Sequence, residues 1–118
     1  DWQDEFVTAA GDSLRQGVIC DEFGYVQELH LAWNNLHSTL GMPLELQHLE
    51  KLETLEMHFN EIGGDFPQSF RRMPQLKHVS LMKTGMVGSL PGWIGELTQL
   101  TSLGLGDNHM RGDLPESL

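Results

Sequence analysis

The chain has 118 residues, and its 7 Lys and Arg residues against 17 Asp and Glu residues give a formal net charge of −10. A surface this negative is repelled by phosphate backbones and by anionic lipids, which argues against nucleic acid or a membrane face as the main partner. The length suits one domain, and no apolar run in the sequence approaches the roughly 18 residues that a membrane span needs.

The first predicted element is a short amphipathic helix over residues 1–14. Phe6, Ala10 and Leu14 recur at helical spacing, and Trp2 lies close to the same face. Acidic residues near its start suit the positive end of a helix. We expect this helix to cover one end of the structure that follows.

A β-hairpin is predicted next. Residues 18–20 and 25–26 are short strand-like stretches, and the sequence DEFG between them is typical of a turn. The second strand is expected to run on into the first of several repeats.

From residue 26 onward the sequence repeats with a fixed period. The stretches LETLEMHFNEIGGDFP, LKHVSLMKTGMVGSLP and LTSLGLGDNHMRGDLP begin at Leu52, Leu76 and Leu100, 24 residues apart, and a less regular copy begins at Val26. Apolar residues occupy places 1, 4, 6, 11 and 15 of this frame, an Asn or its substitute place 9, Gly place 13 and Pro place 16. A period of this size indicates a repeat architecture in which each turn packs on its neighbours.

The frame L-x-x-L-x-L-x-x-N-x-L resembles a leucine-rich repeat. The 24-residue period with its G-x-ϕ-P element resembles the plant-type subclass, found in plant receptor kinases, polygalacturonase-inhibiting proteins and many algal and protist proteins. The resemblance implies an α/β fold, a leucine-rich-repeat right-handed solenoid with a parallel concave β-sheet, a second short strand near each G-x-ϕ-P, and an N-terminal cap of helix and hairpin.

The implied organisation is an N-terminal cap over residues 1–25 and four leucine-rich repeats over residues 26–118, the last incomplete. After each proline a short helical or 3₁₀ segment should return the chain to the next strand. The chain starts without Met and ends inside a repeat, so we expect the full-length protein to continue beyond Leu118.

The cap bears on the cellular setting. In the plant-type family it often reads W-x-G-V-x-C, with the Cys paired to another; here residues 17–20 match the second half, but Arg15 stands where Trp is usual and Cys20 is the only cysteine. Cys20 is either a buried thiol that packs as a small apolar residue, which we favour, or a cysteine whose partner lay in a removed segment. The resemblance implies an extracellular or lumenal setting, while the absence of a disulfide partner argues against it.

Successive side chains of a strand point to opposite faces, so the non-Leu positions of the frame should look out onto the concave sheet. Stacking the four strands gives four columns, namely Glu28, Thr54, His78 and Ser102; His30, Glu56, Ser80 and Gly104; Ala32, His58, Met82 and Gly106; and Trp33, Phe59, Lys83 and Asp107. Trp33 and Phe59 then lie side by side, and exposed aromatic rings with Met and His are typical of protein-binding surfaces. The alternative is that both rings lie under the N-terminal segment or a neighbouring loop.

The ninth place of the frame is predicted to be structural. An inward Asn at Asn34, Asn60 or Asn108 can hydrogen-bond the backbone groups left free where a strand turns into a loop. Thr84 occupies this place in the third copy and has one hydroxyl and no amide. That turn is expected to be the less tightly satisfied one.

The sequence offers only weak candidates for a metal site and for catalysis. His30, Glu56 and His78 could in principle hold Zn²⁺ from neighbouring strands, but six histidines spread over four repeats produce such neighbours by chance, and no H-E-x-x-H or C-x-x-C spacing supports a site. Glu28 with Glu56 resembles an acid/base pair, yet an open sheet has nothing to exclude water. We expect neither a metal, a cofactor nor catalysis.

The sequence therefore predicts a non-catalytic recognition or scaffold module that binds a protein or peptide on its concave face. The candidate contact residues are Trp33, Phe59, His58, Met82, Lys83, His30 and Glu56. One alternative is a structural accessory subunit of a larger complex, which could include a membrane-associated one. Another is a fragment of a receptor ectodomain, or of an enzyme whose catalytic part lies outside these residues.

Overall fold

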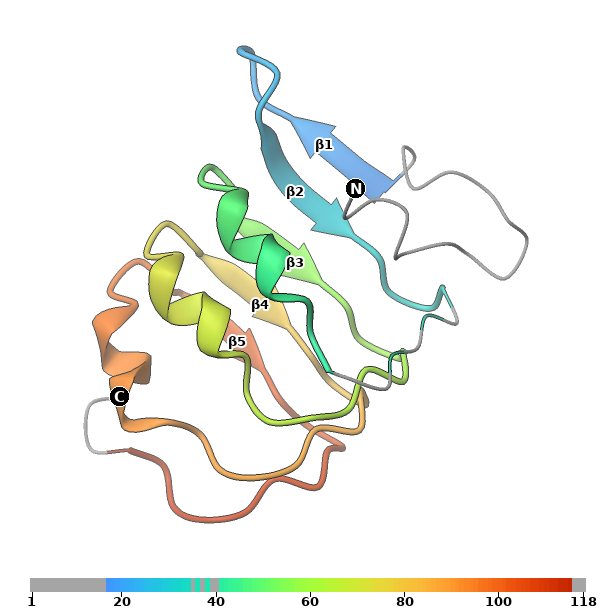
Figure 1. The fold of residues 1–118 in the computed structure, drawn as a ribbon, viewed down its shortest axis with the longest axis vertical. Helices are drawn as coiled ribbons and strands as arrows, with labels where there is room; N and C mark the ends of the chain where they lie inside the picture. The colour runs from blue at the N-terminus through green and yellow to red at the C-terminus, as the bar shows by residue number, and fades with distance from the viewer. Residues whose placement is uncertain (1–16, 35, 37, 39–40, 116–118) are drawn as a thin grey trace.

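The computed structural model describes residues 17–34, 36, 38 and 41–115. Within them one five-stranded sheet has the order β1 (Val18–Cys20), β2 (Val26–His30), β3 (Thr54–Glu56), β4 (His78–Ser80) and β5 (Ser102–Gly104). β1 runs antiparallel to β2, and β2 to β5 are parallel (Figure 1). The helix predicted over residues 1–14 lies outside the described residues. No helix in the described part of the chain is long and apolar enough to cross a membrane.

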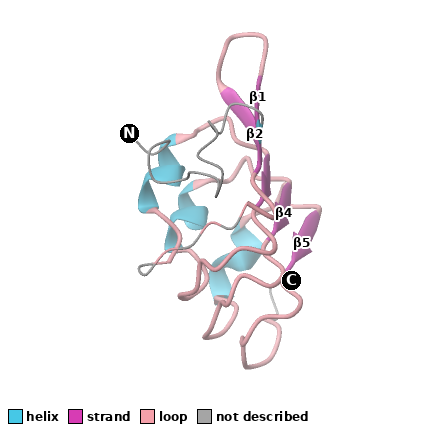
Figure 2. Ribbon diagram, turned by 90° about the vertical axis from the view of Figure 1, so that its right-hand side faces the viewer, coloured by secondary structure: helices cyan, strands magenta, loops and turns pink. Residues whose placement is uncertain are grey.

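Three short 3₁₀ helices form the second layer: η3 (Leu44–His48), η4 (Gln68–Arg72) and η5 (Gly92–Glu96). Each begins directly after a proline, at Pro43, Pro67 or Pro91, with φ of −65°, −65° and −71°. Proline fixes φ near this value and lacks an N–H that the first turn of a helix does not use. Figure 2 shows the helices on one side of the solenoid and the sheet on the other. This confirms the predicted short helical segments that return the chain to the next strand.

The core fills the space between these two layers. It is built from the frame positions, with the fourth place giving Leu29, Leu55 and Val79, the sixth Leu31, Met57 and Leu81, and the eleventh Leu36, Ile62 and Met86. Leu46, Phe70 and Ile94 from the 3₁₀ helices meet them. Since these side chains are at most 4% exposed, the strand face that carries them is fully used by packing. The opposite face, which we call the open face, is left for other roles.

The predicted β1–β2 hairpin is confirmed, but the expectation of a buried Cys20 thiol is wrong. Asp21 Oδ1 accepts hydrogen bonds from the amides of Phe23 and Tyr25, at 2.9 and 3.0 Å, and so closes the turn. Cys20 is exposed. β1 stands at the edge of the sheet, and its register to β2 shifts between Ile19 and Cys20, so the thiol does not follow the alternation that would turn it inward.

The second strand expected near each G-x-ϕ-P is reduced, among the described residues, to a single bridge at Glu61, whose N donates to Leu36 O at 2.9 Å and whose O accepts from Ser38 N at 3.0 Å. Gly64, Gly88 and Gly112 have φ of +76°, +78° and +88°, which takes the backbone out of the extended geometry that a strand ladder needs. At the glycines themselves the turns are linked by isolated backbone hydrogen bonds, from Val87 N to Gly64 O at 2.9 Å and from Arg111 N to Gly88 O at 2.6 Å. The loops therefore stack without forming a second sheet.

The ninth-place side chains seal the turns at the ends of the strands. Asn60 is 4% exposed; its Oδ1 accepts from Leu36 N at 2.9 Å, and its Nδ2 donates to Leu31 O and Met57 O at 2.8 Å each. Thr84 donates its hydroxyl to one backbone carbonyl, Leu81 O, at 2.8 Å. The turn is nevertheless satisfied, because Ile62 N donates to Thr84 O at 3.0 Å and Leu81 O also accepts from Asn108 Nδ2 at 2.8 Å, so the expectation of a less tightly satisfied turn is not borne out.

Candidate binding surface

The register of the sheet places the outward side chains of the open face in rows, as the sequence predicted. Glu28 is paired with Thr54, and Thr54 with His78. In the next row His30 is paired with Glu56, and Glu56 with Ser80. The same register separates His78 from His30 and Glu56, because His78 stands one row away. The described residues hold no group of three or more His, Cys, Asp or Glu that could bind a metal ion.

Beyond the strand ends, one row of the open face has a backbone conformation that its side chains do not favour. The residue before the ninth place has positive φ in all four copies, at Trp33 (59°), Phe59 (61°), Lys83 (51°) and Asp107 (56°). This left-handed conformation costs an L-residue other than Gly about 1–2 kcal/mol. The turn imposes this conformation on whichever residue stands there. The backbone therefore gives no reason for a bulky aromatic side chain at this position.

Trp33 and Phe59 form a stack in this row. Their ring centroids are 3.7 Å apart, with an angle of 12° between the planes, and Lys83 Nζ lies 5.6 Å from the centroid of the Phe59 ring. Since Trp33 comes from the repeat before Phe59 and Lys83 from the repeat after, they approach the phenyl ring from opposite sides. We call Trp33, Phe59 and Lys83 the aromatic ladder. The Trp33 side of it is open, since this residue is 70% exposed.

His58 and Met82 flank the ladder, so four of the predicted contact residues gather around Phe59. The His58 ring meets Phe59 edge-on at 5.7 Å and 75°, and its Nδ1 lies 3.0 Å from Ser80 Oγ. Met82 lies against the next strand, where a Cβ added to Gly104 or Gly106 would be 3.6 Å from its Cγ or 3.7 Å from its Cε. The two glycines therefore leave room for the Met82 side chain.

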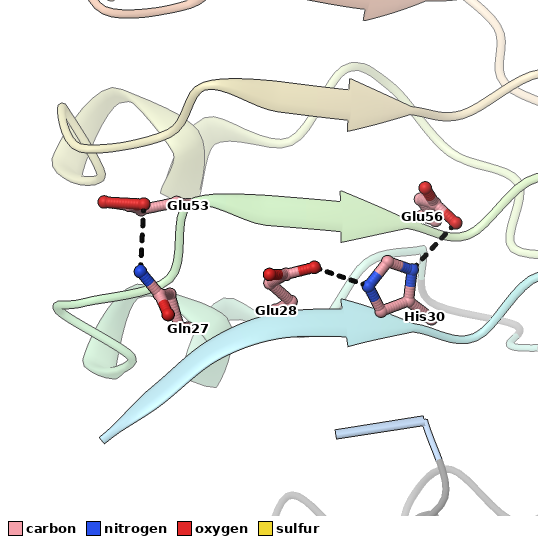
Figure 3. Close-up of polar contacts among 5 residues, drawn as sticks. All are labelled: Gln27, Glu28, His30, Glu53 and Glu56. Carbon is pink, nitrogen blue, oxygen red and sulfur yellow. Dashed lines mark hydrogen bonds and ion pairs between the residues drawn. The ribbon is translucent and has the colours of Figure 1, made fainter. Parts of the chain in front are cut away.

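The remaining two predicted residues, His30 and Glu56, form a separate cluster with Glu28. His30 Nε2 lies 2.7 Å from Glu28 Oε1, and His30 Nδ1 lies 2.9 Å from Glu56 Oε2 (Figure 3). A neutral imidazole has one N–H, so only the protonated ring can donate to both carboxylates. We call these three residues the imidazole cluster. The hydrogen bonds that His30 donates, to Glu56 first and then to Glu28, raise its pKa above 6.5.

The sequence prediction placed Glu28 on the open face but not among the contact residues. The signal for its role is the spacing of Glu28 and His30 two residues apart in β2, with Glu56 in register with His30 on β3. Alternation puts all three side chains on one face of adjacent strands. A second polar link joins the same strands nearer their start, from Gln27 Nε2 to Glu53 Oε2 at 3.2 Å (Figure 3).

Comparison with known proteins agrees with this architecture. The family model described as Leucine Rich Repeat matches residues 51–73. Receptor-like protein 39 of Arabidopsis thaliana is 38% identical over 102 residues, which cover 86% of this chain and 11% of that protein. The chain is a plant-type leucine-rich-repeat protein. It spans about a tenth of the length of such curated relatives, 11% for both receptor-like proteins 39 and 52.

Solved leucine-rich-repeat structures superpose well. The Arabidopsis receptor kinase HAESA ectodomain, in complex with an N-terminally extended IDA peptide hormone, shares 34% identity with a TM-score of 0.70, covering 77% of this chain and 15% of that one. The plant peptide hormone receptor RGFR1 in complex with RGF2 shares 29% identity with a TM-score of 0.76, covering 86% and 19%. These relatives are receptors, which agrees with the extracellular setting that the resemblance to plant-type leucine-rich repeats implies.

Proposed function

We propose that this chain is a non-catalytic recognition module that binds an extended peptide or a protein segment on the open face of its first three repeats. The aromatic ladder is the centre of the contact, with His58 and Met82 beside it and His30 and Glu56 of the imidazole cluster at its margin. The observation that carries the proposal is the Trp33–Phe59 stack, in which the Trp33 ring is exposed to solvent and both residues have a backbone conformation that disfavours them.

The energetics of the stack support this role. Left-handed φ costs Trp33 about 1–2 kcal/mol, and a stacked aromatic pair gives back about 0.5–1.5 kcal/mol. Burial adds little for Trp33, because its side chain is 70% exposed. The indole thus contributes close to nothing to folding, while a large rigid aromatic surface is the type of group that anchors protein interfaces.

The relatives support a peptide or protein as the partner. HAESA and RGFR1 are solved with bound peptide hormones, and each shares with this chain the sheet whose open face is proposed to bind. Both proteins are receptors, and the HAESA structure is of its ectodomain. We therefore propose an extracellular setting for this chain as well. The coverage of 15% and 19% of those chains leaves room for further repeats of the same kind in the whole protein.

The polar groups of the open face support binding rather than catalysis. The two carboxylates beside His30 favour its protonated form, and in that form the ring has no lone pair free to accept a proton. His58 lies 3.0 Å from the Ser80 hydroxyl, but among the described residues no carboxylate contacts its ring to orient it. Both groups lie on a sheet face that is open to water, without the enclosure that strengthens catalytic electrostatics.

The test is a peptide-display library panned on the purified chain, on Trp33→Asn and on Phe23→Asn. Asn tolerates left-handed φ, so Trp33→Asn removes the indole without adding strain. Phe23 is a matched control, because its ring is 78% exposed in the hairpin turn and away from the open face. We expect enriched peptides that bind the parent and Phe23→Asn equally and lose at least tenfold in affinity for Trp33→Asn, after thermal unfolding shows that both variants fold.

The same experiment separates the second candidate function, an accessory subunit held through its N-terminal edge. That edge exposes Ile19, Phe23 and Tyr25 at 46%, 78% and 58%. Peptides whose binding depends on Phe23 and ignores Trp33 would favour the accessory subunit and reject the open face as the binding site.

A further inference from the structure

The aromatic ladder has one end occupied by a cation and one end open. Lys83 covers one side of the Phe59 ring, and Trp33 covers the other. Within residues 17–34, 36, 38 and 41–115 no further ring or cation contacts the indole of Trp33. The outer face of this indole is thus an exposed π surface at the end of an ordered stack.

We propose that this open end is a binding site for a cationic side chain of the partner, preferably an arginine, which stacks on the outer face of Trp33. The inference rests on the proposed function and names the chemistry of the residue that the partner inserts. The bound arrangement is cation, indole, phenyl, cation, with the guanidinium and Lys83 at the two ends of the ladder.

The π faces favour a cation over a neutral group. The negative face of an aromatic ring attracts a cation, and Trp is the strongest of the three aromatic side chains in this respect. Lys83 at 5.6 Å shows the same attraction at the other end of the ladder. A guanidinium is planar and weakly hydrated, so it can stack on the indole at a smaller desolvation cost than an ammonium.

The charge of the open face favours the same occupant. Glu56 stands three residues before Phe59, which at about 3.3 Å per strand residue is about 10 Å along the strand, and Glu28 lies one row further away. With His30 protonated, the two carboxylates and one imidazolium leave the imidazole cluster with a net charge of about −1. The Debye length is about 8–10 Å at physiological ionic strength, so salt screens the attraction between this charge and a cation at Trp33 only partly. The net charge of −10 adds to this field, whereas an acidic or phosphorylated side chain would be repelled.

An apolar occupant is the competing possibility, and it predicts a different response to substitution. An apolar side chain on Trp33 would gain from contact area alone, so Leu in place of Trp would retain much of the affinity. A cation gains from the π face, so affinity should fall in the order Trp, Phe, Leu at position 33. The comparison of Trp33→Phe with Trp33→Leu therefore distinguishes the two without removing the apolar bulk of the side chain.

The experiment uses the Trp33-dependent peptides from the display library and, for each, a synthetic twin in which arginine is replaced by citrulline. Citrulline keeps the shape of arginine and lacks the charge. Calorimetry of both peptides is run against the parent, Trp33→Phe and Trp33→Leu. We expect the parent to prefer arginine by about 5- to 30-fold, a smaller preference for Trp33→Phe and none for Trp33→Leu.

Each other result has a single meaning. If the citrulline twin binds as tightly as the arginine peptide while Trp33 remains necessary, the site does not require a cation, so the inference fails and the proposed function stands. If no Trp33-dependent peptide carries arginine or lysine, the inference is equally overturned. If no peptide depends on Trp33 at all, the proposed function itself fails.

Discussion

The open face differs between its first two repeats and its last two. Over β2 and β3 it carries the imidazole cluster and the Trp33–Phe59 stack. Over β4 and β5 it carries His78 and the small residues Ser80, Ser102, Gly104 and Gly106, and Met82 and Lys83 follow β4, where Lys83 reaches back to the Phe59 ring. The buried face is alike in both halves, with Leu29, Leu55 and Val79 at equivalent places.

The difference shows that folding and recognition use different positions of the same repeat. Places 4, 6, 9 and 11 of the frame build the core and the turns in either half, so they do not account for the aromatic and charged residues of the first half. The outward positions can change without loss of the fold, as the bare glycines of the last strand illustrate. Substitutions at the two kinds of position should therefore affect stability and binding separately.

The largest effect is expected from a frame position in the first half. Asn60→Ala removes the side chain that satisfies Leu36 N, Leu31 O and Met57 O, for which no other partner is found among the described residues. Each unsatisfied buried group costs about 1–3 kcal/mol, so we expect a loss of about 3 kcal/mol or more in the free energy of unfolding. Urea denaturation measures it; a loss below about 1 kcal/mol would mean that water reaches the turn and replaces the amide.

A smaller effect is expected at the same place of the third repeat. The hydroxyl of Thr84 donates to Leu81 O, but this carbonyl also accepts from Asn108 Nδ2 at 2.8 Å. Thr84→Val keeps the shape and removes the hydroxyl, and it leaves Leu81 O satisfied, so we expect a loss of about 1 kcal/mol or less. If Thr84→Val matched Asn60→Ala in urea denaturation, the two turns would be equally dependent on their side chains, contrary to the contacts seen.

The fold and the register of the open face could be predicted because the repeat itself encodes them. A 24-residue period aligns equivalent residues of successive strands, and the alternation of the strand then decides which face each occupies. The pairing of His30 with Glu56 and the contact of Trp33 with Phe59 follow from these two rules alone. Neither requires any knowledge of side-chain conformation.

The errors arose where the local backbone departs from the regular strand. The register shift in β1 left Cys20 exposed, and positive φ at Gly64 and its equivalents prevented a second strand. The left-handed backbone at Trp33 has no signal in its own sequence, because Trp, Phe, Lys and Asp share no preference for it. The bridging role of His30 depends on its ring lying between two carboxylates, which register alone does not determine.

Replacement of an outward residue should change stability less than either frame substitution. Trp33→Asn loses a stack of about 0.5–1.5 kcal/mol and relieves left-handed strain of about 1 kcal/mol, so we expect a net change within about 1 kcal/mol. Lys83→Asn is the matched variant at the same place of the third repeat and should be neutral or slightly stabilising. Urea denaturation of both checks this, and a loss of several kcal/mol at Trp33 would make the ring a structural residue.

The imidazole cluster should give the smallest effect on stability, one that depends on pH. The pKa of His30 is raised above 6.5 in the folded protein by its hydrogen bonds to Glu56 and Glu28. The folded state therefore binds the proton more tightly than the unfolded state does. The stabilisation by the cluster is complete below about pH 6.5 and is lost as the pH rises through the folded-state pKa, provided that the carboxylates remain ionised.

His30→Gln, compared with the parent between about pH 5 and 8, measures this contribution. The side chain of His30 is 34% exposed, so the difference in unfolding free energy should stay below about 1 kcal/mol at the acidic end and shrink towards the alkaline end. His78→Gln is the control, because His78 lies on the same face and contacts Thr101 without a carboxylate among the described residues. A gap that widens with rising pH, or an equal gap for His78→Gln, would contradict a specific contribution of the imidazole cluster to stability.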